Sequence, residues 1–268
     1  MVRRARLDAE LVRRGLARSR EQAVEVIAEG RVRVGGALAT KPATAVDPAV
    51  ALVVTAPTGP DFVSRGGRKL AGALDAFAAA GTPFPVADRR CLDAGASTGG
   101  FTDVLLRRGA REVVAVDVGY GQLAWSLRTD ARVHVIDRTN VRHLTPEVIG
   151  GPVDTTTADL SFISLAKVLP ALFECTADDG DVLVLVKPQF EAGRVHVGHG
   201  GVVRDAAARG ATVIAVSEEA LARGWGTHAV TTSPLRGPAG NIEYFLWLRR
   251  GASDIDVAAL EQLVAGRA

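Results

Sequence analysis

The sequence contains only two cysteines, Cys91 and Cys175, in 268 residues. Two cysteines cannot form the disulfide framework of a small secreted domain, and neither has a cysteine or histidine at metal-ligand spacing. No apolar run approaches the roughly 18 residues that a membrane-spanning helix needs. The basic first residues lead into an amphipathic segment, not into the apolar core of a signal peptide. We therefore expect a cytoplasmic protein without a metal ion.

Charge is balanced overall but not along the chain. The formal net charge is +2, yet residues 1–60 hold ten basic against six acidic side chains. This segment therefore carries +4, and the remaining 208 residues carry −2. A basic first segment predicts contact with nucleic acid, although a solvated basic face would have the same composition.

Lysine is also scarce, because only four of the 32 basic residues are lysines. Arginine does not give up its proton, so a lysine at a motif position is a candidate for acid–base chemistry. The four lysines are Lys41, Lys69, Lys167 and Lys187.

Hydrophobic periodicity divides the chain into two parts. Residues 5–15 place Leu7, Leu11 and Val12 on one helical face, and Ser19 with Gln22 predicts the capping box of a second helix that ends at Gly30. Strands are expected at 31–34 and 51–54. We predict a small α+β RNA-binding domain at 1–59, a linker at 60–65 and a second domain at 66–268.

From residue 66 onward, helices alternate with buried strands. Repeated units of this kind predict an α/β fold with a doubly wound, mostly parallel sheet. The expected strands are 90–93, 112–117, 132–136, 153–159, 182–186, 227–231 and 243–248, and the expected helices are 69–80, 101–108, one from 122, and 212–223.

Residues 91–102 form the strongest local pattern, an apolar strand that runs into a glycine-rich turn and then a helix. Ligands of α/β sheets bind at the carboxyl ends of strands. Asp117 ends the next strand, 22 residues after Gly95, and suits the two hydroxyls of a ribose. The glycines do not follow the dinucleotide spacing, and Asp93 would repel a pyrophosphate but suit an ammonium group.

S-adenosylmethionine, with its ammonium, sulfonium and ribose, is therefore the expected cofactor. A nucleotide and a purely structural turn are the alternatives. The expected cofactor-binding residues are Asp93, Gly95, Ala96, Ser97, Thr98, Gly99, Gly100, Phe101, Asp117 and Asp159.

Four charged residues are expected near this turn: Lys69, Asp159, Lys187 and Glu243. A charged group at the end of an apolar strand is costly when it is buried without a partner. Two lysines and two carboxylates would neutralise one another. Each residue alone is compatible with a structural salt bridge at a sheet end. All four together beside a methyl-donor pocket indicate an active site more specifically.

These four residues resemble the Lys-Asp-Lys-Glu tetrad of the FtsJ-related ribose 2′-O-methyltransferases, which have a Rossmann-like fold. The first segment resembles the RNA-binding domain named after ribosomal protein S4, in the runs 6–8, 15–20 and 30–35 and at Lys41-Pro42. The combination is typical of the TlyA family, also called haemolysin A. Its specific stretches are residues 93–102, 117–123, 159–164 and 186–191.

The resemblance implies methylation of cytidine ribose in ribosomal RNA of the large subunit, the small subunit, or both. Lys187 is then the expected general base, which Asp159 orients, while Glu243 holds Lys69 or the 2′-hydroxyl. Phe162 is expected to stack on the target base, although a core position is the alternative. The expected RNA-binding residues are Arg4, Arg6, Arg18, Arg20, Lys41, Arg138, Arg142, Phe162 and Arg194.

Two other functions stay open at this point. A non-catalytic ribosome-assembly factor would keep the fold without the chemistry, but the intact donor loop and tetrad speak against it. A haemolysin would need a membrane-active segment, and the sequence shows none. His196 and His199 have the spacing of a metal-ligand pair, but no further ligands accompany them, so a glycine-rich loop is the preferred interpretation.

Overall fold

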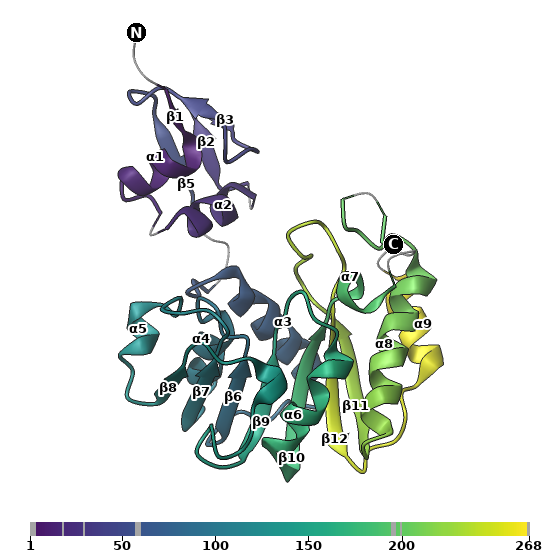
Figure 1. Ribbon diagram of the computed structural model, residues 1–268. Helices are drawn as coiled ribbons and strands as arrows, with labels where there is room; N and C mark the ends of the chain where they lie inside the picture. Colours follow the sequence, from purple (N-terminus) through teal and green to yellow (C-terminus); the bar gives the residue numbers. More distant parts are fainter. Residues whose placement is uncertain are drawn as a thin grey trace. The chain divides into compact units, whose positions relative to one another are not determined.

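The computed structural model describes residues 4–17, 19–28, 30–56, 60–193, 197–198 and 200–266. The chain forms two compact units, Met1–Arg65 and Gly66–Ala268 (Figure 1). Arg18, Arg194, His196 and His199, which the sequence singled out, lie outside the described residues.

The first unit is a small α+β fold with its own apolar core. The side chains of Leu7, Leu11, Ile27 and Val32 are almost completely buried in it. The N-cap is confirmed at Ser19, whose Oγ accepts a hydrogen bond from the Gln22 backbone N–H at 3.1 Å. Its elements are β1 (Ala5–Arg6), α1 (Leu7–Arg13), α2 (Arg20–Ala28), β2 (Val32–Val34), β3 (Ala37–Leu38), β4 (Ala45–Val46) and β5 (Leu52–Val54).

The second unit is built on a seven-stranded sheet with the order β11-β12-β10-β9-β6-β7-β8. Strands β10, β9, β6, β7 and β8 are parallel, and β12 pairs antiparallel with both β10 and β11. The expected doubly wound, mostly parallel sheet is thus confirmed. The strands are β6 (Arg90–Ala94), β7 (Glu112–Val116), β8 (Val133–Ile136), β9 (Val153–Ala158), β10 (Thr176–Val186), β11 (Trp225–Thr232) and β12 (Tyr244–Arg250).

Helices cover both faces of this sheet, as the alternation along β12 illustrates. Tyr244 and Leu246 join the core cluster that contains residues of the helices α6 (Leu169–Glu174), α8 (Ala206–Leu221) and α9 (Val257–Ala265). Trp247, on the opposite face, packs edge-on against Phe77 of α3 (Arg65–Ala79) at 5.5 Å between ring centroids. Successive strand residues point to opposite faces, so one strand supplies both cores.

Several element boundaries differ from those expected. Helix α8 begins six residues before the expected residue 212, because the Asp205 side chain caps it by accepting a hydrogen bond from the Ala207 N–H. Helix α5 (Trp125–Arg128) begins after the expected residue 122, because the backbone of Ala124, with ψ 138°, is not helical and forms the N-cap. The patterns also missed α6, α9 and the short helix α7 (Pro188–Glu191).

Candidate active site

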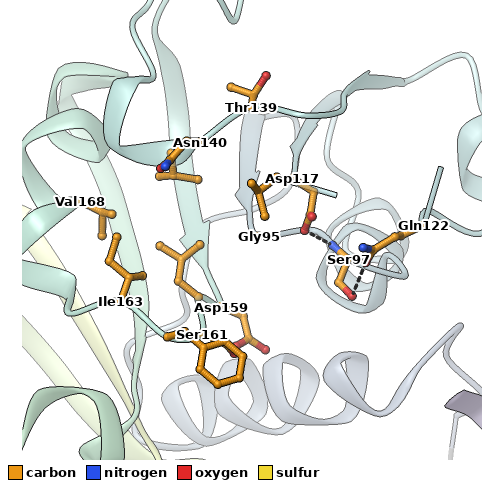
Figure 2. Close-up of a pocket in the computed structure, with 14 residues that line it drawn as sticks. Gly95, Ser97, Asp117, Gln122, Thr139, Asn140, Asp159, Ser161, Ile163 and Val168 are labelled. Carbon is orange, nitrogen blue, oxygen red and sulfur yellow. Dashed lines mark hydrogen bonds between the residues drawn. The ribbon is translucent and has the colours of Figure 1, made fainter. Parts of the chain in front are cut away.

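A pocket of about 420 Å³ lies at the carboxyl ends of the parallel strands, near the topological switch point. From β6 the chain winds through β7 to β8 at one side of the sheet and then returns to β9 at the other side of β6. The pocket is lined by Gly95, Ser97, Asp117, Val118, Gln122, Thr139, Asn140, Val141, Asp159, Leu160, Ser161, Phe162, Ile163 and Val168 (Figure 2).

Gly95 and Asp159 meet at this switch point. Gly95 has φ +88°, and a Cβ atom there would lie 2.6 Å from the Asp159 carbonyl oxygen. A side chain at this position would therefore be strained by its backbone conformation and would also collide with the neighbouring loop. The glycine lets the loops after β6 and β9 approach each other closely beside the pocket.

Asp117 connects the glycine-rich loop after β6 to the loop after β7. Its Oδ2 accepts a hydrogen bond from the Ser97 backbone N–H at 2.8 Å (Figure 2). Its Oδ1 accepts another from the Gly119 N–H at 2.6 Å. Gln122 also reaches this loop, because its Oε1 lies 3.4 Å from the Ser97 Oγ. The Asp117 carboxylate thus lines the pocket and shapes its wall.

Asp93 is placed differently from the other cofactor candidates. Its side chain is completely buried and is not among the residues that line the pocket. One oxygen accepts a hydrogen bond from the Thr102 hydroxyl at 2.6 Å, and the other has no hydrogen-bond partner in the described part of the chain. Burial raises the pKa of Asp93 to about 7, against the effect of the Thr102 hydrogen bond.

The four tetrad residues form two separate ion pairs. Lys187 Nζ lies 2.5 Å from Asp159 Oδ1, and Lys69 Nζ lies 2.6 Å from Glu243 Oε2. The second pair is almost completely buried, with 6% of the Lys69 side chain and 1% of the Glu243 side chain exposed. The contact between Lys187 and Asp159 is close but lacks hydrogen-bond geometry, because Asp159 Oδ1 has no hydrogen-bond partner among the described residues.

Comparison with known proteins places this site in a family. Residues 62–250 match the FtsJ-like methyltransferase family, and residues 5–50 match the S4 domain. The chain belongs to the FtsJ-like methyltransferase family. The chain is 63% identical over 249 residues to the 16S/23S rRNA (cytidine-2′-O)-methyltransferase TlyA of Mycobacterium tuberculosis, which covers 93% of this chain and 91% of that protein.

Two further relatives carry another name. Hemolysin A of Brachyspira hyodysenteriae is 36% identical, covering 89% of this chain and 97% of its own. A solved structure from Streptococcus thermophilus, described as a candidate hemolysin, is 37% identical with a TM-score of 0.78 and covers 99% of this chain and 96% of its own. No helix in the described part of this methyltransferase is long and apolar enough to cross a membrane.

Sequence reasoning missed Ser161, which follows Asp159 by two residues in the methyltransferase. Its Oγ accepts a hydrogen bond from Lys187 Nζ at 2.9 Å, and the residue also lines the pocket. Ser161 lies in the family-specific stretch 159–164, but a hydroxyl beside a motif carboxylate is too common a pattern to be assigned a role. Serine hydroxyls acquire this kind of role only when the fold brings a partner from another strand.

Phe162 lies at the mouth of the pocket in a strained backbone conformation. Its φ is +63°, and 91% of its side chain is exposed. Left-handed backbone is unusual for a bulky residue and concentrates at functional sites. The ring also borders a second hollow of about 780 Å³, shared with Arg142 and with Phe190, whose ring centroid is 5.2 Å away. The core position considered for Phe162 is therefore wrong.

Two predicted RNA-binding arginines of the S4 domain share one buried acid, Asp8. The guanidinium groups of Arg6 and Arg20 both contact Asp8 Oδ2, at 2.8 Å and 3.1 Å, while about half of each arginine side chain stays exposed. These contacts hold the pKa of Asp8 well below its usual range, and the hydrogen bond from Arg6 has the largest effect. Arg4 and Lys41 are also exposed.

Arg138 and Arg142 are exposed in the loop that follows β8. Arg138 has φ +57°, and its guanidinium carbon lies 4.2 Å from the centre of the Tyr120 ring. In the part of the chain that the structure describes, no group of three or more His, Cys, Asp or Glu side chains could hold a metal ion.

Proposed function

We propose that this methyltransferase transfers a methyl group from S-adenosylmethionine to the 2′-hydroxyl of cytidine in 16S rRNA, 23S rRNA or both. The observation that carries the proposal is the Lys187–Asp159 pair at 2.5 Å, in which Asp159 lines the pocket. The name of the mycobacterial relative, which is 63% identical, supports the substrate.

The pocket residues fit the methyl donor. Gly95 leaves space that a Cβ would fill, and the free lone pairs of Asp117 can accept the two ribose hydroxyls of the donor. When bound, the donor supplies an electrophilic methyl group on sulfur. Asp93 is the exception, because its buried position does not support direct contact with the ligand.

Lys187 acts as the general base for the attacking hydroxyl. A ribose hydroxyl is a poor nucleophile, so its proton must leave as the new bond to carbon forms. Asp159 keeps Nζ near the donor pocket by charge. Lys187 first gives one ammonium proton to solvent, and its amine then accepts the proton of the 2′-hydroxyl as the methyl group is transferred to that oxygen. Alignment of the hydroxyl with the methyl group supplies the rest of the rate enhancement.

Lys69 and Glu243 have a supporting electrostatic role. Glu243 Oε2 is bound to Lys69, while Glu243 Oε1 would collide with a Cβ on Gly237, at 2.6 Å. The loop backbone therefore packs against this carboxylate and keeps it in place. The pair positions one charge of each sign at the edge of the sheet where the tetrad lies.

The partner is ribosomal RNA within ribosomal subunits, in the cytoplasm. The exposed arginines around Asp8 support a phosphate-binding role for the S4 unit, and Arg138, Arg142 and Phe162 support RNA contacts near the donor pocket. Phe162 offers an exposed ring face on which a target base can stack.

Ribosomal RNA from cells with and without this protein tests the proposal. We expect mass-spectrometric mapping to find 2′-O-methylcytidine that is present only when the protein is made. An unchanged set of ribose methylations, with the protein expressed and folded, would contradict the proposed substrate.

We expect Asp117→Ala to weaken S-adenosylmethionine binding by about 1.5–3 kcal/mol, because a charged hydrogen-bond partner is removed. The variant also loses the two acceptors that hold the Ser97 and Gly119 N–H groups. Titration calorimetry measures the affinity. Asp130→Ala is the matched control, since Asp130 pairs with Arg132 and does not line the pocket. Equal affinities for the two variants would remove Asp117 from the donor site.

Removing Arg6 or Arg20 should lower the slope of log affinity for ribosomal subunits against log salt by about 0.7–0.9 each, if each meets one phosphate. Binding measured over a series of salt concentrations gives the slope. Arg13→Ala is the control, because Arg13 is a similarly exposed arginine that pairs with the buried Glu10 in the same unit. The assignment is wrong if the Arg6, Arg20 and Arg13 variants all keep the parent slope.

We expect the free energy of unfolding of Asp93→Asn, relative to that of the parent, to increase as the pH rises. The folded pKa of about 7 lies above the ordinary value of 3.8, so the folded state holds a proton that the unfolded state loses. The parent therefore loses stability between pH 4 and pH 7, by about 4 kcal/mol, and the loss is complete above pH 7. Urea denaturation of both proteins at pH 4 and pH 7.5 measures the difference. A pH-independent difference would show that Asp93 is not buried in solution.

A further inference from the structure

Lys187 Nζ has one directional contact in the described part of the chain, the hydrogen bond to Ser161 Oγ at 2.9 Å. Asp159 attracts the same nitrogen at 2.5 Å, but that contact lacks hydrogen-bond angles. Only 9% of the Lys187 side chain is exposed, so few water molecules can compete for the N–H groups. Ser161 therefore orients Nζ through a hydrogen bond, whereas Asp159 attracts it by charge.

The geometry of an amine explains why one anchored N–H matters. The three positions on Nζ are tetrahedral and turn together about the Cε–Nζ bond. Fixing one position therefore fixes the directions of the other two. In the neutral amine that accepts a proton, one of these positions is the lone pair. A hydroxyl that holds one N–H thus limits the lone pair to two directions, and the negative charge of Asp159 favours the second N–H at the position nearer to it.

We propose that Ser161 is a positioning residue that sets the direction of the Lys187 lone pair toward the target hydroxyl. The proposal rests on the proposed function, in which Lys187 is the general base. Ser161 holds one N–H, Asp159 attracts the second, and the third position is left for the acceptor. Ser161 also lines the donor pocket. Its hydrogen bond therefore fixes the direction of the third position on Nζ with respect to the pocket.

The loop after β9 makes this arrangement possible. Asp159 and Ser161 are two residues apart on the same loop and lie near each other at one side of the pocket (Figure 2). The next residue, Phe162, has left-handed backbone, so the chain turns sharply directly after the hydroxyl. Lys187 arrives from the end of the adjacent strand β10, and its single nitrogen meets both side chains.

Ser161→Ala and Ser161→Thr separate positioning from a merely structural hydroxyl. Single-turnover methyl transfer to purified subunits is measured beside the affinities for S-adenosylmethionine and for the subunits. We expect Ser161→Ala to lower the rate about tenfold with both affinities unchanged, less than complete loss of a general base costs. Ser161→Thr retains the hydroxyl and should restore the rate to within about threefold of the parent.

Ser253→Ala is the matched control, because Ser253 is an exposed serine after the far end of β12. It should transfer methyl groups at the parent rate. A parent rate for Ser161→Ala overturns the proposal, and so does a loss that Ser161→Thr shares equally or that follows a loss of affinity. If Lys187→Arg is inactive while Ser161→Ala is unimpaired, only the role of Ser161 fails. If Lys187→Arg is active, the base assignment fails as well.

Discussion

Lys187→Arg is expected to slow single-turnover methyl transfer by about 10²–10⁴-fold. Arginine preserves the positive charge that Asp159 attracts but does not give up its proton at the working pH, so it cannot accept the ribose proton. Labelled S-adenosylmethionine and purified ribosomal subunits provide the assay, and donor affinity is measured separately. The donor affinity should stay near that of the parent, because Lys187 does not line the pocket.

Arginine substitutions of two other lysines show whether the loss of rate is specific to the general base. Lys167→Arg, at an exposed position, should leave the rate unchanged. Lys69→Arg should be slower than the parent but faster than Lys187→Arg, because the role of Lys69 is electrostatic. A Lys187→Arg enzyme within a few-fold of the parent rate would exclude the base role and leave positioning alone. If both Lys69→Arg and Lys187→Arg are inactive, shape matters as much as charge at each position.

Glu243→Leu should destabilise the fold by about 3–5 kcal/mol, because it leaves the buried Lys69 ammonium without its partner. Replacing both residues, in Lys69→Met with Glu243→Leu, should bring stability back close to the parent while activity stays lost. Urea denaturation gives the free energy of unfolding for each protein. A stability within about 1 kcal/mol of the parent for Glu243→Leu alone would contradict the burial of this pair.

The sequence predicted those parts of the site that depend on strand ends. Gly95, Asp117 and Asp159 follow strands that apolar runs identify, and parallel strands bring their carboxyl ends to one edge of the sheet. The pairing of Lys69 with Glu243, 174 residues apart, was one of the two partners expected for Glu243, because buried charges need partners of the opposite sign.

Other features depend on side-chain packing that no local pattern encodes. Asp93 comes after an apolar run, as Asp117 does, yet it lies within β6, paired with Ala115 of β7, and is buried and bound to Thr102. Ser161 gains its role only because Lys187 arrives from a neighbouring strand. Helix α6 is only six residues long, too short for a clear periodic pattern, and Pro170 lies in its first turn, where proline is tolerated.

The most direct test of the account identifies the atom that receives the methyl group. Purified protein, labelled S-adenosylmethionine and unmethylated ribosomal subunits are combined for a single turnover, and the RNA is digested to nucleosides for mass spectrometry. We expect label on the ribose of cytidine as 2′-O-methylcytidine with the parent enzyme, and none with Lys187→Arg at the same time point. Label on a nucleobase, or equal ribose labelling by Lys187→Arg, would contradict it.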